Sequence, residues 1–233
     1  MQTSLPPGIR AVLFDKDGTL FDFQATWGAW AHQLIDLLAG GDATLGAAMA
    51  DAMAFDRASG RFRPESMVIA GTGREVAELL APIVGRDADT LEAQIAEAAA
   101  AAPLAESVPL RALLQRLRAA GLKLGVATND FEGVARRHVA GVIDLFDFIA
   151  GFDSGHGGKP EPGMLLAFAR QCDLPPAAVL MVGDSRHDLI AGRAAGMATL
   201  AVLTGVAQAG DLADLADTVR PDIGHLPELL GLA

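Results

Sequence analysis

Short apolar runs that alternate with helical patterns constrain the fold of this 233-residue chain more than any other feature. The first run, residues 11–14, stops at an aspartate, which is typical of a buried strand with polar residues at its end. Leu110, Leu113, Leu114 and Leu117 follow the i, i+3, i+4, i+7 spacing of an amphipathic helix. The alternation predicts an α/β fold, a parallel sheet with helices on both faces. Further strands are predicted over 124–128, 146–151, 179–183 and 199–203, and further helices over 131–139, 163–171 and 187–195.

The segment from residue 22 to residue 107 interrupts this alternation. It has almost no strand-like run and is rich in alanine and other strong helix formers. We therefore predict two domains, a core of residues 1–21 and 108–233 and an inserted all-α domain of residues 22–107. Residues 206–233 are expected to close the core with a helix and a strand. Helices of the insertion are predicted over 26–39, 44–55, 74–84 and 88–102.

The acidic composition limits the partners to expect. The chain has 18 lysines and arginines against 29 aspartates and glutamates, a net charge of −11. Nucleic-acid binding depends on cationic side chains that neutralise phosphates, so no nucleic-acid partner is predicted. No run reaches the roughly 18 apolar residues of a membrane span, and residues 1–10 do not resemble a signal peptide. A cytoplasmic protein without a membrane partner is expected; its oligomeric state cannot be read from the sequence.

Polar residues stand at the ends of the predicted strands and beside the helices that follow. Because the carboxyl ends of parallel strands meet at one edge of a sheet, we expect these side chains to lie together. They are Asp15, Asp17 and Gly18 in the first loop, Thr128 and Asn129 in the second, Lys159 before the helix at 163–171, and Asp184 and Asp188 after the strand at 179–183.

Several of these residues match the ligands that Mg²⁺ prefers. Magnesium binds hard oxygen atoms, which Asp15 and Asp184 can supply. Alternate residues of an extended chain face the same way, so Asp17 is expected in the same pocket as Asp15. Asp188 either caps a helix or helps to hold the metal site, and we predict the second role. The predicted magnesium site is Asp15, Asp17, Asp184 and Asp188.

The remaining residues suit a phosphate group and its transfer. Lys159 offers a positive charge, Thr128 a hydroxyl donor, and Gly18 and Asn129 further contacts for a bound anion. Asp15 can attack phosphorus, and Asp17 can act first as a general acid and then as a general base. Lys159 and Thr128 are thus predicted as catalytic residues with Asp15 and Asp17. Asp-Gly is also an ordinary turn signal, so a plain turn is the alternative for the first loop.

The motifs resemble those of the haloacid dehalogenase-like superfamily. Its first motif resembles residues 15–20, its second Thr128, its third Lys159 with Pro160, and its fourth Asp184 with Asp188. The resemblance implies a Rossmann-like core, a magnesium ion, an aspartate nucleophile and a small phosphate ester as substrate. It also implies that the helical insertion is a cap that closes over the site and selects the substrate.

Comparison with branches of the superfamily narrows the expected reaction. Its dehalogenases lack the second aspartate, which is Asp17 here, and its phosphonatases use a cap lysine, whereas residues 22–107 contain no lysine. Residues 71–73 and the loop around Lys159 resemble phosphoglycolate phosphatases, so a magnesium-dependent phosphatase acting through an aspartyl phosphate is predicted. A sugar phosphomutase, or a binding protein that keeps the fold without catalysis, remains open as an alternative.

Residues of the cap leave two questions to the structure. Trp27 and Trp30 are three positions apart on a predicted helix, where they either pack in the cap or line the entrance to the site. Arg61, Arg63 and Arg74 either lie on the surface or bind a carboxylate of the substrate.

Overall fold

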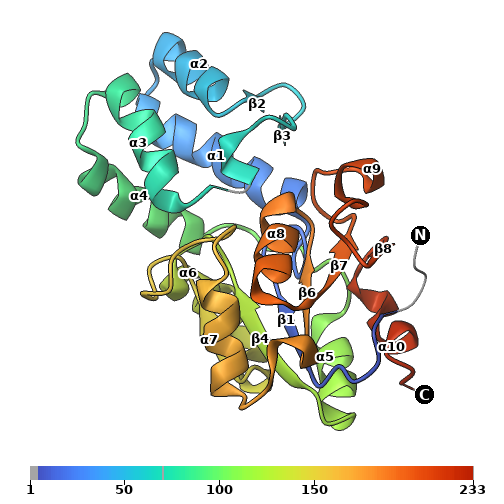
Figure 1. The fold of residues 1–233 in the computed structure, drawn as a ribbon. Coiled ribbons are helices and arrows are strands. Elements are labelled where there is room, and N and C mark those ends of the chain that lie inside the picture. The colour runs from blue at the N-terminus through green and yellow to red at the C-terminus, as the bar shows by residue number, and fades with distance from the viewer. Residues whose placement is uncertain (1–4, 70, 233) are drawn as a thin grey trace.

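The chain folds into a sheet-containing core and a helical cap beside it (Figure 1). In this computed structural model, residues 5–69 and 71–232 are described. The core contains both ends of the described chain, and the cap is inserted between the first and second strands of the sheet. The division into a core of residues 1–21 and 108–233 and a cap of residues 22–107 stays a prediction.

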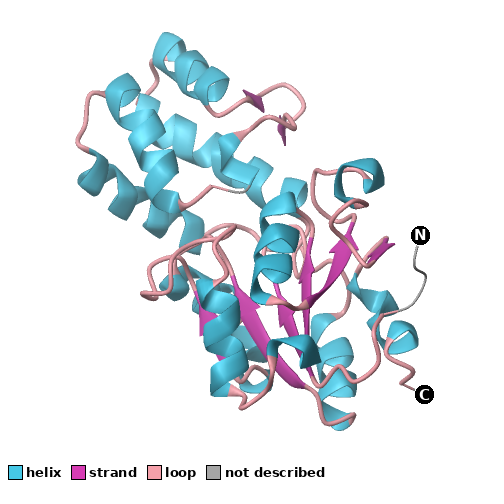
Figure 2. Ribbon diagram, in the orientation of Figure 1, coloured by secondary structure: helices cyan, strands magenta, loops and turns pink. Residues whose placement is uncertain are grey.

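Six parallel strands form the sheet of the core, in the order β5-β4-β1-β6-β7-β8 (Figure 2). This topology confirms the predicted α/β fold. β1 lies between β4 and β6, so the first loop and the ends of two neighbouring strands meet at one edge. The final strand lies in the segment for which a closing strand was predicted. The strands are β1 (Ala11–Phe14), β4 (Lys123–Ala127), β5 (Phe148–Ala150), β6 (Val179–Gly183), β7 (Ala198–Val202) and β8 (Thr218–Arg220).

Alternate side chains of β1 supply the two hydrophobic layers that hold helices to the sheet. Val12 and Phe14 pack with the leucines of α5 (Leu110–Ala119), whereas Ala11 and Leu13 pack with the opposite helices. All four side chains are fully buried, as expected for a central strand covered on both faces. The opposite helices are α7 (Gly163–Gln171) and α8 (Arg186–Ala195); the remaining core helices are α6 (Glu132–His138), α9 (Ala209–Leu212), α10 (Leu226–Leu229) and the 3-10 turns at Ala140–Leu145, Pro176–Ala178 and Ile223–His225.

Four helices build the cap, close to the predicted ranges. Each begins after a residue whose side chain accepts a backbone N–H of the first turn, so local capping determines where it starts. Asp22, for which no role was predicted, is the cap of the first of them and accepts from Ala25 N–H at 2.8 Å. The helices are α1 (Phe23–Ala39), α2 (Ala43–Ala52), α3 (Gly73–Val84) and α4 (Ala88–Ala100), with a 3-10 turn at Met67–Ile69.

The cap also contains a small hairpin that the sequence did not predict. α2 ends before residue 55, and β2 (Phe55–Asp56) pairs antiparallel with β3 (Arg61–Phe62). The side chain of Gln24 in α1 holds this hairpin, because it donates to the Phe62 carbonyl at 3.0 Å and accepts from the Phe62 N–H at 2.9 Å. Gly28 permits the close approach: a Cβ there would lie 2.2 Å from the Gly60 carbonyl oxygen.

Within the described ranges, no helix combines the length and the apolar composition that a membrane crossing needs.

Candidate active site

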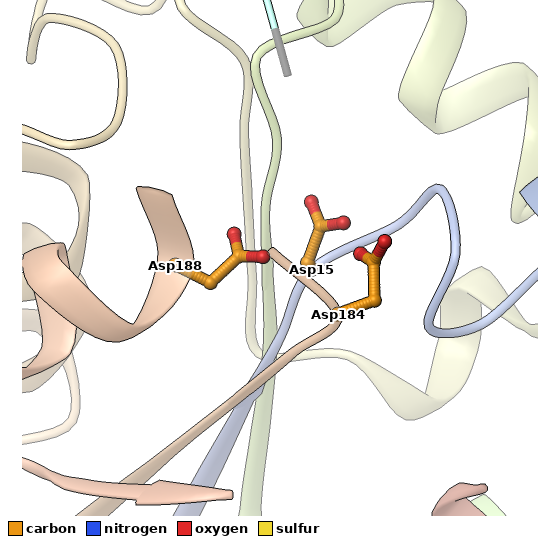
Figure 3. A group of neighbouring side chains, drawn as sticks. All are labelled: Asp15, Asp184 and Asp188. Carbon is orange, nitrogen blue, oxygen red and sulfur yellow. The ribbon is translucent and has the colours of Figure 1, made fainter. Parts of the chain in front are cut away.

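Three buried aspartates lie together at the carboxyl edge of the sheet (Figure 3). Asp15 follows β1, Asp184 follows β6, and Asp188 lies in the first turn of α8. One carboxylate oxygen from each lies within 4.8 Å of the others, and none of the three residues is more than 6% exposed. The structure thus brings together two neighbouring strand ends and the following helix, as the sequence predicts.

Lys159 is the cation of this cluster. Its Nζ lies 2.5 Å from Asp15 Oδ1 and 2.6 Å from Asp188 Oδ1. Burial alone would lower the pKa of Lys159, but the charges of Asp15 and Asp188 raise it above its ordinary value. One ammonium group therefore faces three carboxylates.

Excess negative charge makes the cluster suited to a cation. Burial, opposed by Lys159 and reinforced by Asp188, raises the pKa of Asp15 to about 7. Burial, with the charges of Asp188 and Asp15, also raises the pKa of Asp184 well above its ordinary range. Both shifts have the same physical cause: carboxylates are buried together with too little positive charge. An all-oxygen donor set with uncompensated charge fits Mg²⁺.

Asp188 has two roles in the structure. Its Oδ2 accepts from the Ser185 N–H at 3.0 Å and from the Ser185 hydroxyl at 2.7 Å, which caps α8. Its Oδ1 pairs with Lys159. The capping contacts fix the carboxylate, so the helix start and the position of the lysine are linked. The capping role considered from the sequence is present, and the role of Asp188 in a metal site stays a prediction.

Asp17 lies apart from the cluster of three, which differs from its predicted place as a fourth ligand. Its Oδ2 is paired with Lys16 Nζ at 2.7 Å. Its Oδ1 has no hydrogen-bond partner among the described residues, and the side chain lines the same cavity as Asp15. Asp17 is thus placed to meet a bound molecule rather than to complete the acidic cluster.

Thr128 and Asn129, at the end of β4, differ in what their side chains contact. The Thr128 hydroxyl oxygen accepts from the Asp130 N–H at 3.1 Å, which leaves its proton for another acceptor. The Asn129 side chain donates to the Lys159 carbonyl at 2.8 Å and accepts from the Lys159 N–H at 2.7 Å. Asn129 therefore positions the backbone of Lys159, and direct phosphate binding by it stays a prediction.

Gly18 has a different role from the predicted one. Its N–H donates to the Phe21 carbonyl at 2.7 Å instead of pointing to an anion site. Its φ is +82°, and a Cβ there would lie 2.4 Å from the carboxylate carbon of Asp184. A glycine is needed because the first loop turns in a left-handed conformation directly against Asp184.

Lys16 is the site residue that sequence reasoning missed. It is fully buried, and its Nζ contacts Asp17, Asp130 at 2.9 Å and His138 Nδ1 at 3.0 Å. Because His138 Nε2 donates to the Ala99 carbonyl at 2.9 Å, Nδ1 is the acceptor for the lysine. A lysine between two aspartates, directly after a buried apolar strand, was the available signal, because a buried ammonium group needs nearby carboxylates.

A cavity opens above the acidic edge, between core and cap. Trp27 and Trp30 line it and also pack in the hydrophobic core of the cap, so both of the roles considered for them are present. Residues 71–73 line it too; Thr72 caps α3 through a capping box with Glu75. Arg74 instead binds Glu78, Asp89 and Glu92, outside the cavity. Among the described residues, the other lining side chains include Phe23, Val68, Ile69, Val76, Ile95 and Ala99 from the cap.

Comparison with known proteins assigns the family. The model of the haloacid dehalogenase-like hydrolases matches residues 9–196. This chain belongs to that family. The match spans the first loop, the cap and the edge of the sheet that carries the acidic cluster, and it confirms the resemblance drawn from the motifs.

Relatives within the family include proteins named phosphoglycolate phosphatase. One from Neisseria gonorrhoeae is 40% identical over 122 residues, which span 50% of this chain and 50% of the relative. One from Rhodospirillum rubrum is 32% identical over 240 residues, 95% of this chain and 91% of the relative. The first of these matches thus covers about half the length of the relative, and the second nearly all of it.

The fold of the chain is also found in a solved structure. CbbY from Rhodobacter sphaeroides, solved in complex with phosphate, has a TM-score of 0.67 at 21% identity, covering 96% of this chain and 100% of CbbY. At this identity the likeness shows the shared fold of core and cap.

Proposed function

We propose that this protein is a magnesium-dependent phosphatase that hydrolyses a small phosphomonoester through an aspartyl phosphate on Asp15. The observation that carries the proposal is that two aspartates line one cavity, each paired with a different buried lysine. Asp15 lies in the acidic cluster beside Lys159, and Asp17 has an unpartnered Oδ1 among the described residues. One suits a nucleophile and the other a proton donor.

The acidic cluster supplies the candidate ligands. Asp15, Asp184 and Asp188 would hold Mg²⁺, with Asp188 also holding Lys159 in place. The ion, when bound, offsets the repulsion between the carboxylate of Asp15 and the negative charge of the phosphate. Lys159 and the hydroxyl proton of Thr128 would contact phosphoryl oxygens, and Asn129 fixes the Lys159 backbone.

The proposed reaction has two steps, transfer of the phosphoryl group to Asp15 and hydrolysis of the aspartyl phosphate. A carboxylate oxygen of Asp15 attacks phosphorus, the bond from phosphorus to the ester oxygen breaks, and Asp17 gives its proton to the departing alkoxide. Asp17 then takes a proton from a water molecule that attacks the phosphorus of the aspartyl phosphate. This step releases inorganic phosphate and restores the Asp15 carboxylate.

The names of the relatives make 2-phosphoglycolate the first ester to test, because proteins named phosphoglycolate phosphatase align with the chain. Phosphate release from a panel of phosphomonoesters, with and without Mg²⁺, tests the proposal. We expect magnesium-dependent release by the wild type and a loss of at least about 10³-fold in Asp15→Asn, because that variant lacks the nucleophile.

Asp51→Asn is the matched control, since Asp51 is an exposed aspartate of the cap. It should retain wild-type rates. Equal activity of Asp15→Asn and wild type would refute the aspartyl-phosphate route. Isomeric phosphate esters with little free phosphate would identify a phosphomutase instead, and binding without turnover would identify a non-catalytic binding protein.

A further inference from the structure

The two walls of the cavity differ in charge. The core wall carries Asp15, Asp17, Asp130, Asp184 and Asp188. Lys159 is the only lysine or arginine that lines the cavity within the described ranges, and it is already bound to two carboxylates. The described cap residues on the other wall are neutral, mostly aliphatic and aromatic. A substrate's leaving group, which must lie beyond the phosphate, therefore meets the neutral wall.

Two indole N–H groups on that wall lack partners. Trp27 is 7% exposed and Trp30 is 2% exposed, and the Nε1 atom of each has no hydrogen-bond partner among the described residues. An indole nitrogen can only donate, so each needs an acceptor. A buried donor without a partner is destabilising, which is why such groups are usually paired with protein, water or ligand.

Trp27 lies on the leaving-group side of the site. Its ring centroid is 5.1 Å from Lys16 Nζ, and the same ammonium group contacts Asp17. Asp17 is the proposed donor to the departing oxygen, so Trp27 borders the space where that oxygen leaves. Trp30 stands edge-on to Trp27, with ring centroids 5.1 Å apart and planes at 84°. Both residues line the cavity, and the Nε1 atom of each is buried without a partner among the described residues.

Among the described residues of this wall, no cationic side chain is available to a carboxylate on the leaving group. Lys16 is bound by Asp17, Asp130 and His138 and does not line the cavity, and Arg74 is bound by three acidic residues outside it. The N-terminus of α3 reaches the cavity, but the Glu75 carboxylate already accepts from Thr72 N–H at 2.7 Å. An anionic leaving group would be buried without a counter-charge, which is costly.

We infer that the cap selects a phosphomonoester of a neutral ring alcohol with acceptor oxygens, such as a sugar, over a carboxylated ester such as 2-phosphoglycolate. The ring packs against the indoles, and its oxygen atoms accept from the Nε1–H groups of Trp27 and Trp30. This inference rests on the proposed phosphatase function and names the class of its substrate.

Intrinsic fluorescence measures binding at this wall directly, because the chain has two tryptophans, both in the cavity, and no tyrosine. Asp15→Asn with Mg²⁺ is titrated with glucose 6-phosphate, 2-phosphoglycolate and inorganic phosphate. We expect glucose 6-phosphate to change the emission. Its dissociation constant should be at least about tenfold lower than that of 2-phosphoglycolate, which corresponds to the free energy of one well-made contact. Equal or tighter binding of 2-phosphoglycolate overturns the inference.

Kinetics of the wild type and of two variants test the donors. Trp27→Phe and Trp30→Phe keep an aromatic ring and remove the N–H. In each, the ratio of kcat/KM for glucose 6-phosphate to kcat/KM for phenyl phosphate should fall roughly three- to tenfold, the equivalent of one hydrogen bond. An unchanged ratio in both folded variants contradicts the assignment of the donors. The ranking of esters by the wild type tests the inference even where a variant does not fold.

The failures of the two proposals are distinguishable. If the wild type hydrolyses 2-phosphoglycolate best and the reaction depends on Asp15 and Mg²⁺, the phosphatase proposal stands and the neutral-alcohol inference is wrong. If no ester is hydrolysed, the phosphatase proposal fails, and the fluorescence titration alone decides whether the cap prefers a neutral ring ester.

Discussion

Two buried lysines, each paired with an aspartate of the first loop, differ in how well their charges are balanced. The chain has three lysines, and Lys16 and Lys159 lie in this site. Lys159 contacts Asp15 and Asp188, with Asp184 in the same acidic cluster. Lys16 contacts Asp17, Asp130 and His138.

This difference in charge balance distinguishes the proposed catalytic cluster around Lys159 from the supporting cluster around Lys16. An ammonium group has three N–H donors, and Lys16 has three acceptors at 2.7–3.0 Å, which match them in number. Around Lys159, three carboxylates share one lysine, and the pKa of Asp15 and of Asp184 is raised mainly by burial. In our proposal the unbalanced cluster attracts a cation, which then allows a phosphate group to bind, whereas the more balanced cluster holds Asp17 in position.

Lys159→Met should have the largest effect on activity. This variant removes the ammonium group that contacts Asp15 and Asp188 and, in our proposal, the phosphate. We expect kcat to fall about 10³-fold with Mg²⁺ saturating. Lys123→Met is the control, because Lys123 is on the surface and 48% exposed. Comparable losses in both variants would mean that lysine removal acts through general destabilisation.

Lys16→Met should have a smaller effect on activity and a clear effect on stability. It leaves the half-buried Asp17 and Asp130 without their cation, so we expect a loss of about 3 kcal/mol in unfolding free energy. Because Asp17 loses its fixed position but not its carboxyl group, kcat should fall roughly 10- to 100-fold, less than in Lys159→Met.

The double variant Lys16→Met, Asp130→Asn sharpens the comparison, since it removes the charges of Lys16 and Asp130 together. Denaturant unfolding should show recovery of part of the lost stability, while kcat stays low. A kcat equal to that of wild type in Lys16→Met would show that Lys16 does not position Asp17.

The acidic cluster should make metal-free stability depend on pH. Burial raises the pKa of Asp15 from 3.8 to about 7, and that of Asp184 also rises. Between pH 3.8 and about 7, the folded protein keeps protons on these carboxylates that the unfolded chain has released. The stability that this protonation contributes is therefore fully present below about pH 4 and is lost as the pH rises through about 7. In chelator, we expect stability to fall by on the order of 2 kcal/mol between pH 5 and pH 8.

Magnesium should restore stability more at pH 8 than at pH 5, because protons compete for the same oxygens. Denaturant unfolding at both pH values, with chelator and with Mg²⁺, measures this difference. Asp15→Asn should reduce the dependence on pH. A metal effect that is the same at both pH values would argue against the raised pKa of these carboxylates.

His138→Phe should have the smallest effect. Phenylalanine keeps the ring packing against Phe21 and Trp27 but loses the contacts to Lys16 and to the Ala99 carbonyl. We expect a loss of about 1–2 kcal/mol at pH 8 and a change in kcat below that of Lys16→Met. A larger effect on kcat than that of Lys16→Met would place the main support of Asp17 on the histidine.

The same variant carries a pH signature. Burial, with the charge of Lys16, lowers the pKa of His138 from its ordinary value of 6.5. The folded protein then resists protonation of this ring, so the stability it contributes is present above pH 6.5 and is lost as the pH falls. Denaturant unfolding measured at several pH values between 5 and 8 checks this. The unfolding free energy of His138→Phe should fall less than that of wild type as the pH is lowered.

The sequence by itself determined the sheet, the cap helices and the edge at which the polar residues gather. Apolar runs of strand length predict β1, β4 and β6, and the geometry of parallel strands places Asp15, Thr128 and Asp184 at their common edge. Capping residues such as Thr72 act within one turn, so local sequence is enough to place helix starts.

Only the tertiary structure decided what these side chains contact. Lys16 is hydrogen-bonded to His138, which is 122 positions away in the sequence. Asn129 is hydrogen-bonded to the backbone of Lys159, which is 30 positions away. The hairpin depends on Gln24 and on the absence of a side chain at Gly28, neither of which has a local signature. Partners so distant in sequence are fixed by packing and charge balance, which the local pattern does not contain. The neutral wall over the acidic edge arises in the same way, from cap and core meeting across the cavity.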